Sequence, residues 1–137
     1  MWKKFDISTT TNSIDNLTIQ IVHVKGYLDS STFPQLQTHL QNLIQQGHFR
    51  LIVEFGDLNY ISSAGLGVLM GMLQEVRNQD GDLKLANMSS KIQHLFDMLG
   101  FSRLIRIYDT VENASQAFVA DTKTEEKTEE QKPEDSY

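Results

Sequence analysis

The sequence predicts a single α/β domain with a mixed central sheet of about four to five strands and about four helices, in the order ββαβαβαβα. Three observations lead to this fold class. The chain has 137 residues, which suffices for one domain and is too short for two with separate cores. Segments rich in β-branched residues alternate with segments in which apolar residues recur every three or four positions. Strands separated by helical crossovers pair in parallel, so most neighbours in the sheet should be parallel.

The amino-terminal third predicts a β-hairpin followed by a helix. Residues 17–24 are rich in β-branched residues with roughly alternating polarity, which is typical of a strand, and residues 6–10 are a weaker strand candidate before it. Asparagine, serine and aspartate residues between the two provide turn chemistry. The helix that follows begins near Phe33, where Pro34 fits a first helical turn, and ends before Gly47. The antiparallel hairpin makes the predicted sheet mixed.

The rest of the domain predicts three more strand–helix pairs. Residues 49–55 are a short apolar run of the buried-strand type, and we expect residues 56–61 to connect it to the next helix. An Asp-Gly pair ends the first of these three helices, and two serines cap the second. Asp109 to Glu112 has the spacing of a capping box at the start of the third. The remaining expected strands are residues 82–86 and 104–108, and the expected helices are residues 63–78, 90–99 and 111–120.

The composition excludes several classes of function. Because the chain has no cysteine, it has no disulfide, no catalytic thiolate and no cysteine-based metal site. No segment approaches the run of about 18 apolar residues that a membrane helix needs. No apolar segment follows the basic Lys3-Lys4 pair as in a secretory signal, so we expect a cytoplasmic protein without membrane contact. A net charge of −6 and the lack of a basic stripe argue against nucleic-acid binding.

The carboxy-terminal segment, residues 121–137, differs from the rest of the chain. It holds seven acidic residues and three lysines, a net charge of −4, and no hydrophobic residue before Tyr137. Such a segment cannot bury enough apolar surface to offset the entropy lost on ordering it. We therefore expect a domain at residues 1–120 and a disordered acidic tail, which either keeps the protein soluble or binds a regulatory partner.

The most informative stretch lies at the start of the second predicted helix. Ser62 and Ser63 stand at a loop-to-helix transition, where backbone N–H groups lack partners and the helix end carries partial positive charge. A serine here is either a plain N-cap or a displayed hydroxyl on which a phosphate is tolerated. Gly65, Gly67 and Gly71 follow, each at a cost of about 1 kcal/mol relative to alanine. Their presence indicates a close approach of the helix backbone, either to the sheet or to a partner.

Enzymatic and metal sites match the sequence poorly. The glycine spacing is not that of a dinucleotide-binding loop, and no Gly-Lys-Ser/Thr follows, which excludes a P-loop. A serine hydrolase elbow would need glycine where Ile61 stands. The histidines are too scattered for a metal site and are expected at the surface or in hydrogen bonds. They are His23, His39, His48 and His94. We therefore expect no enzymatic activity, no cofactor and no bound metal.

The stretch around Ser63 resembles the signature of STAS-domain proteins, and specifically of the small bacterial anti-sigma factor antagonists. That signature is an aspartate, a phosphoacceptor serine, a small residue, and then Gly-Leu-Gly before an apolar helix. Ser63 matches the phosphoacceptor, Ala64 the small residue, and Gly65-Leu66-Gly67 the glycine pair. Ser62 stands where the family usually has aspartate, which makes Ser62 an alternative acceptor.

Other segments extend the resemblance over about residues 5–120. Gly26 to Asp29 is similar to the family's Gly-x-Leu-Asp motif, with Asp29 on its aspartate. Residues 51–55 resemble the strand that leads to the signature, and residues 92–100 resemble the family's third helix. The resemblance therefore implies a STAS-like fold for the whole expected domain.

The resemblance also implies a protein-binding switch. The unphosphorylated protein, a monomer when free, would bind an anti-sigma factor that is also a serine kinase, and so free a sigma factor. Phosphorylation of Ser63, or alternatively of Ser62, would break the complex, and a PP2C-type phosphatase would restore it. The implied partner-binding residues are Asp29, Ser62, Ser63, Ala64, Gly65, Leu66 and Gly67, together with any exposed parts of Leu69 and Met70.

A second interpretation keeps the STAS-type scaffold but changes the partner. The serine at position 62 and the acidic tail favour a module of another signalling complex. Such a module would bind a response-regulator phosphatase, a sensor assembly or a small ligand. Identification of the protein that co-purifies with the chain separates the two interpretations.

Overall fold

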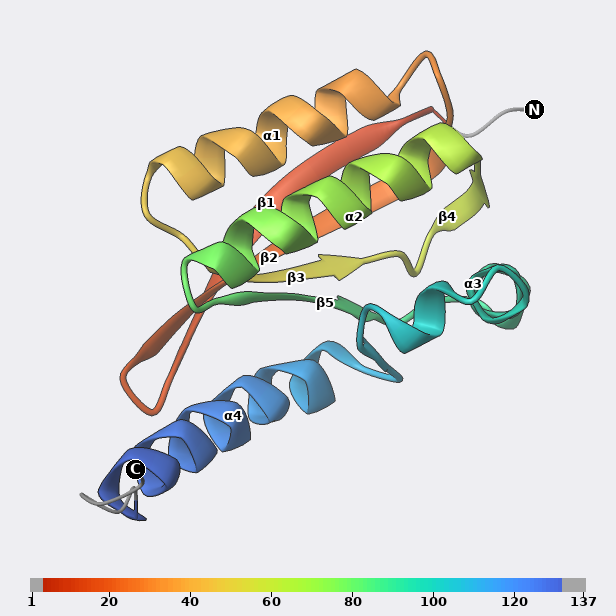
Figure 1. The fold of residues 1–137 in the computed structure, drawn as a ribbon. Helices are drawn as coiled ribbons and strands as arrows, with labels where there is room; N and C mark the ends of the chain where they lie inside the picture. Colours follow the sequence, from red (N-terminus) through yellow and green to blue (C-terminus); the bar gives the residue numbers. More distant parts are fainter. Residues whose placement is uncertain (1–3, 132–137) are drawn as a thin grey trace.

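The fold is given by a computed structural model that describes residues 4–131, with side chains described for residues 4–122. Strands and helices alternate along most of the chain (Figure 1). The strands are β1 (Asp6–Ile14), β2 (Leu17–Leu28), β3 (Arg50–Glu54), β4 (Leu58–Ile61), β5 (Asp82–Ala86) and β6 (Ile107–Tyr108). The helices are α1 (Phe33–Gln45), α2 (Ser63–Asn78), α3 (Ser90–Met98) and α4 (Val111–Gln131), and a short 3-10 helix, η1, spans Phe101–Arg103. Within the described part of the chain, no helix is long and apolar enough to cross a bilayer.

The strands form one mixed sheet of six strands in the order β1-β2-β3-β5-β6, with β4 paired to the carboxy-terminal end of β2. β1 and β2 are antiparallel, and the turn between them contains Asp15 and Asn16, both with positive φ, as tight hairpins require. The other strand pairs are parallel. The predicted α/β class and the mixed sheet are therefore confirmed.

Helices cover both faces of the sheet. The buried residues of α1, α2 and α3 share one core with the inward side chains of β2, β3 and β5. Figure 1 shows α1 and α2 running side by side over the sheet, apart from α4. On the other face, α4 packs on a smaller core. The contacts there join Ala114, Phe118 and Val119 of α4 to Ile19, Ile21 and Ile52 of the sheet.

Two strands differ from those expected. The connection expected over residues 56–61 contains β4, so the sheet has six strands instead of four to five. The outer two residues of β4 are buried and the inner two exposed, which lacks the strict alternation that marks a strand in a sequence. The last strand has only two residues instead of residues 104–108. The preceding chain forms η1, and the Ile105 N–H donates to the Phe101 carbonyl instead of to β5.

The last helix extends past its expected end at residue 120. α4 continues to Gln131, in a stretch that contains four glutamates and two lysines, which are good helix formers. Asp121, expected in the tail, is held by the domain, because its carboxylate accepts a hydrogen bond from buried Lys84 at 2.8 Å. The domain therefore includes Asp121. A disordered tail stays a prediction, and residues 132–137 lie outside the described residues.

Candidate functional site

The amino end of α2 lies at the rim of the sheet, beside the end of β2. Ser62 is the N-cap of α2: its backbone is extended (φ −95°, ψ 169°), and its hydroxyl accepts a hydrogen bond from the Gly65 N–H at 3.4 Å. The Ser62 N–H donates to the Leu28 carbonyl at 2.8 Å, which ties the start of α2 to β2. The hydroxyl of Ser62 therefore has a structural role.

Ser63 occupies the first helical position of α2, and its side chain is exposed. Among the described residues, no hydrogen bond engages its hydroxyl. The first turn of α2 contains no acidic residue, so no side chain of that turn neutralises the partial positive charge of the helix end. A phosphate on Ser63 would lie against this positive end, so the helix itself tolerates the modification.

The three glycines of α2 have two different roles. A Cβ on Gly65 would lie 2.9 Å from Leu28 Cγ, so glycine at this position lets α2 lie close to β2. Gly67 and Gly71 are exposed, and a Cβ on either would meet no atom within 4 Å. The fold does not require glycine at these two positions. They lie on the same side of α2 as Ser63, at the spacing of one helical turn, and leave this side of the helix flat.

Asp29 shapes the turn between β2 and α1. Its carboxylate accepts hydrogen bonds from the Ser31 hydroxyl at 2.6 Å and from the Ser31 N–H at 2.8 Å. Its carbonyl accepts from the Phe33 N–H at 2.8 Å, at the start of α1. The hydrogen bond from the Ser31 side chain is the main reason that the pKa of Asp29 lies below its ordinary value of 3.8. Asp29 is therefore ionised at neutral pH, and it is partly exposed.

The fold brings Asp29 to the start of α2. β2 and β4 pair in parallel with Leu28 opposite Ile61, so Asp29 and Ser62 directly follow the ends of two adjacent strands. Ser63 is exposed next to them. Of the other residues expected to bind a partner, Gly67 is exposed and Ala64 is half-buried. We refer to Asp29, Ser62, Ser63, Ala64 and Gly67 as the rim, since they lie at the end of the sheet where α2 begins and in the first turns of α2.

Two of the expected contact residues face the core instead of the rim. Gly65 is buried, and Leu66 is only 1% exposed because it packs between α2 and the sheet. Leu69 is likewise fully buried, whereas Met70 is half-buried. Helical periodicity turns these side chains inward from a helix whose first turn is pressed onto β2. Gly65, Leu66 and Leu69 therefore pack beneath the exposed side of α2, whereas Met70 is partly accessible at the surface.

Tyr60 is a rim residue that the sequence reasoning missed. It lies on β4, two residues before the cap of α2, and its side chain is 53% exposed. Residues 56–61 were expected to be a loop, and an exposed tyrosine in a loop does not by itself indicate a binding site. The available signal was an aromatic residue two positions before the first of the two serines.

Comparison with known proteins identifies the family of the chain. The STAS domain, as a family, matches residues 10–114 of the chain. The chain belongs to the STAS-domain family. The anti-sigma-B factor antagonist of Bacillus subtilis strain 168 is 37% identical to it over 87 residues, which cover 63% of this chain and 78% of that relative. The predicted family and its anti-sigma factor antagonist type are therefore confirmed.

Solved structures share the STAS fold with this chain. An anti-sigma factor antagonist from Mycobacterium paratuberculosis has a TM-score of 0.71 and 18% identity, over 82% of this chain and 94% of that one. The anti-sigma factor antagonist SpoIIAA in its unphosphorylated form has a TM-score of 0.67 and 22% identity, over 83% and 95%. SpoIIAA, a Bacillus cell fate determinant, has also been solved in the phosphorylated form, with a TM-score of 0.61 and 23% identity, over 83% and 98%.

Three histidines of this STAS domain are held in hydrogen bonds that do not involve Ser63. His23 bonds a glutamate, His39 a threonine and His48 a glutamine. Over residues 4–122, no group of three or more potential metal-ligating side chains comes together. None of these three histidines is placed to activate Ser63 as a nucleophile.

Proposed function

We propose that this protein is an anti-sigma factor antagonist that binds an anti-sigma factor while Ser63 is unphosphorylated and releases it once Ser63 carries a phosphate. The observation that carries this proposal is the exposed Ser63 hydroxyl at the amino end of α2, beside a Ser62 hydroxyl engaged as the cap. The similarity to anti-sigma factor antagonists supports the same role, as does the existence of SpoIIAA in two phosphorylation states. The protein acts by binding and not by catalysis.

The proposed contact surface is the rim around Ser63. It consists of Tyr60 and of Asp29, Ser62, Ser63, Ala64 and Gly67. Exposed aromatic residues such as Tyr60 often contribute strongly to protein interfaces, because they bury a large area with few rotatable bonds. Gly67 allows the backbone of a partner to approach α2 closely.

Phosphorylation would change this surface by charge and by size. A phosphoryl group adds about −1.5 to −2 charges at neutral pH. The added charge would stand on the same rim as the ionised Asp29, so a bound partner would have to desolvate it next to a like charge. A loss of about 2–4 kcal/mol in binding free energy, which is typical for such a buried unpaired charge, is enough to separate two proteins. The kinase is the anti-sigma factor itself, acting with ATP, and a PP2C-type phosphatase reverses the modification.

Phosphate mapping tests the proposed acceptor. The protein is mixed with its cognate anti-sigma kinase and ATP, and the modified residue is located by mass spectrometry. We expect one phosphate on Ser63, retained in Ser62→Ala and absent in Ser63→Ala. A phosphate on neither serine would remove the switch, and a phosphate on Ser62 alone would reverse the assignment.

Binding measurements test the proposed surface independently. Ser63→Asp should weaken the anti-sigma factor complex by about 2 kcal/mol, or roughly thirtyfold in Kd, while the thermal unfolding midpoint stays unchanged. Gln74→Asp, an exposed substitution about three turns further along α2, is the matched control for added charge. Unchanged affinity of Ser63→Asp for the anti-sigma factor would exclude the rim from that interface.

A second candidate function is a STAS scaffold that binds a different signalling partner. The serine at position 62, where anti-sigma factor antagonists usually have aspartate, is the observation that favours it. Affinity purification of the full chain from its native cells, followed by mass spectrometry, separates the candidates. A kinase-type anti-sigma factor among the captured proteins supports the first, and its absence together with a different signalling protein supports the second.

A further inference from the structure

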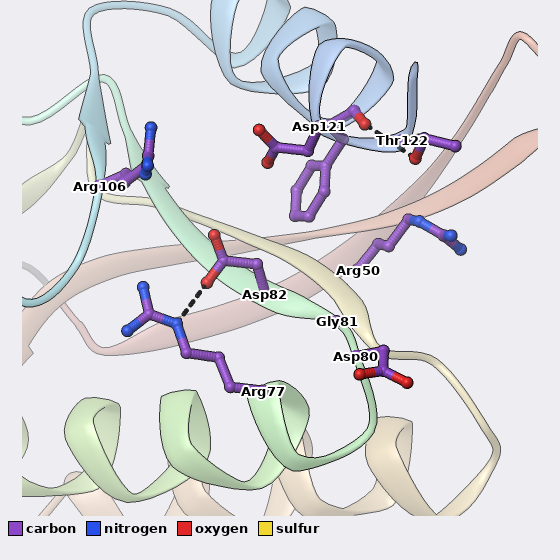
Figure 2. Close-up of a pocket in the computed structure, with 9 residues that line it drawn as sticks. Arg50, Arg77, Asp80, Gly81, Asp82, Arg106, Asp121 and Thr122 are labelled. Carbon is purple, nitrogen blue, oxygen red and sulfur yellow. Dashed lines mark hydrogen bonds and ion pairs between the residues drawn. The ribbon is translucent and has the colours of Figure 1, made fainter. Parts of the chain in front are cut away.

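A cavity at the carboxy-terminal end of α2 gathers most of the arginines of the chain. Its volume is about 440 Å³, and its walls come from the starts of β3 and β5, the end of α2, the segment before β6, and α4 (Figure 2). The chain has four arginines, and three of them line this cavity: Arg50, Arg77 and Arg106. These three come from distant parts of a chain whose net charge is −6, so their meeting is a feature of the fold and not of a basic segment.

Two of the acidic side chains in the cavity are already engaged. The Oδ1 atom of Asp82 accepts a hydrogen bond from Arg77 Nε at 3.0 Å, and its Oδ2 atom accepts from buried Lys84 at 2.9 Å. Asp121 accepts from the same lysine at 2.8 Å. The third acid, Asp80, is exposed in the turn between α2 and β5. Lys84 therefore neutralises part of the negative charge that Asp82 and Asp121 bring to the cavity.

The arginines keep unused donors. Among the side chains of residues 4–122, no carboxylate lies within ion-pair distance of Arg50 or Arg106. Arg77 contacts Asp82 through Nε, and among residues 4–122 its two terminal nitrogens have no hydrogen-bond partner. Figure 2 shows Arg77 and Arg106 to one side of Asp82 and Arg50 to the other. Guanidinium groups present paired N–H donors that match the geometry of phosphate oxygens.

We propose that this cavity binds a small phosphate-bearing anion. Its volume falls within the range of about 300–1,000 Å³ that is usual for small-molecule sites. Guanidinium groups lie on both sides of Asp82. An anion with two linked phosphates can contact more of these groups than one with a single phosphate, so it should bind more tightly. The site is separate from the proposed switch, because α2 places Arg77 about 20 Å from Ser63.

Calorimetric titration of the full chain at constant ionic strength tests this site with two probes, inorganic phosphate and pyrophosphate. We expect pyrophosphate to bind more tightly than phosphate. Arg106→Gln should weaken pyrophosphate binding about tenfold or more, since it removes charge-assisted hydrogen bonds. Arg103→Gln is the matched control, because Arg103 is exposed on η1 and does not line the cavity.

Folding of the variants is checked by their thermal unfolding without ligand. Arg106 is exposed, so Arg106→Gln should unfold at the wild-type temperature, and Arg50→Gln gives a second measurement from the other side of the cavity. Absence of pyrophosphate binding, or equal binding by Arg106→Gln and Arg103→Gln, would overturn the proposal. Arginine-dependent binding of citrate without binding of either phosphate probe would overturn the assignment of a phosphate ligand.

Discussion

Two neighbouring serines at the start of α2 differ in how their hydroxyls are used. The Ser62 hydroxyl accepts from the Gly65 N–H and so satisfies one of the donors that a helix start leaves unpaired. The Ser63 hydroxyl faces solvent. A phosphate on Ser62 would have to displace the cap, whereas a phosphate on Ser63 would not. This difference favours Ser63 as the acceptor in the proposed switch.

Substitution of each serine by alanine separates these roles in the free protein. Ser62→Ala should lower the free energy of unfolding by about 1 kcal/mol, since the helix loses its cap. Ser63→Ala should change it by less than about 0.5 kcal/mol, as is usual for an exposed side chain. Urea unfolding followed by circular dichroism measures both values. Equal losses in the two variants would contradict the assignment of Ser62 as the structural serine.

At the scale of the helix, α2 carries two glycines that its own packing does not require. Gly67→Ala and Gly71→Ala should each raise the free energy of unfolding by about 0.5–1 kcal/mol, because alanine favours the helix and the new methyl group meets nothing. Gly65→Ala should lower it, because the methyl group would press on Leu28. Denaturant titration of the three variants checks this order.

The same variants connect stability with binding. Gly67→Ala should weaken the proposed partner complex although it stabilises the free protein, since the methyl group would stand on the rim one turn from Ser63. An unchanged Kd would remove Gly67 from the contact surface and leave the stability prediction standing.

α4 is attached to the sheet by an ion pair between buried Lys84 and partly exposed Asp121, as well as by apolar contacts. The Lys84 side chain is 0% exposed, and its Nζ atom lies 4.6 Å from the centre of the Phe118 ring. Burial alone would lower the pKa of Lys84, but hydrogen bonds to Asp121 and Asp82 outweigh it and raise the pKa above 10.5. Lys84 is therefore charged at neutral pH, and its charge depends on both carboxylates.

Truncation at two closely spaced positions tests this attachment. A chain that ends at residue 120 should be less stable than one that ends at residue 122 by about 1–3 kcal/mol, because only the shorter chain leaves buried Lys84 without Asp121. The lower part of this range allows for the 45% exposure of the Asp121 side chain. Asp121→Asn in the full chain should reproduce most of the loss. Identical unfolding midpoints for the two truncated chains would show that the ion pair does not anchor α4.

At the scale of the whole molecule, Glu54 joins segments from three parts of the chain. Its carboxylate lies 2.9 Å from His23 Nδ1 on β2, accepts from Asn87 Nδ2 after β5 at 2.8 Å, and accepts from the Gly56 N–H. Burial alone would raise the pKa of Glu54, but the hydrogen bonds from His23, Asn87 and Gly56 outweigh it and hold the pKa below 4.5. The ionised carboxylate therefore stabilises the folded chain.

The stability of the protein should depend on pH through this residue. Because the pKa of Glu54 is lower in the folded than in the unfolded chain, its contribution is complete above pH 4.5 and is lost as pH falls through the folded pKa. Thermal unfolding of wild type and Glu54→Gln should therefore differ most near neutral pH, and the difference should shrink in acid. A difference in Tm that stays constant from about pH 7 to about pH 3 would contradict this account.

The strands and helices that the sequence predicted best are those with local signals. The helix that begins at Phe33 and the hairpin strand within residues 17–24 follow from apolar periodicity, caps and turn residues, which neighbouring positions encode. β4 was missed because it is stabilised by pairing with β2. This pairing joins distant segments, and the sequence of the four residues of β4 does not indicate it. The same holds for the end of α4, where the pair between Lys84 and Asp121 extends the domain.

By itself, the sequence determined the fold class and the identity of the signature around Ser63, because both rest on the order of residues along the chain. Only the tertiary structure decided which residues of the signature are exposed: it placed Leu66 in the core and set Asp29 beside Ser62. It also brought three arginines from separate elements into one cavity. Burial and pairing arise from packing between distant segments, so no local pattern could specify them.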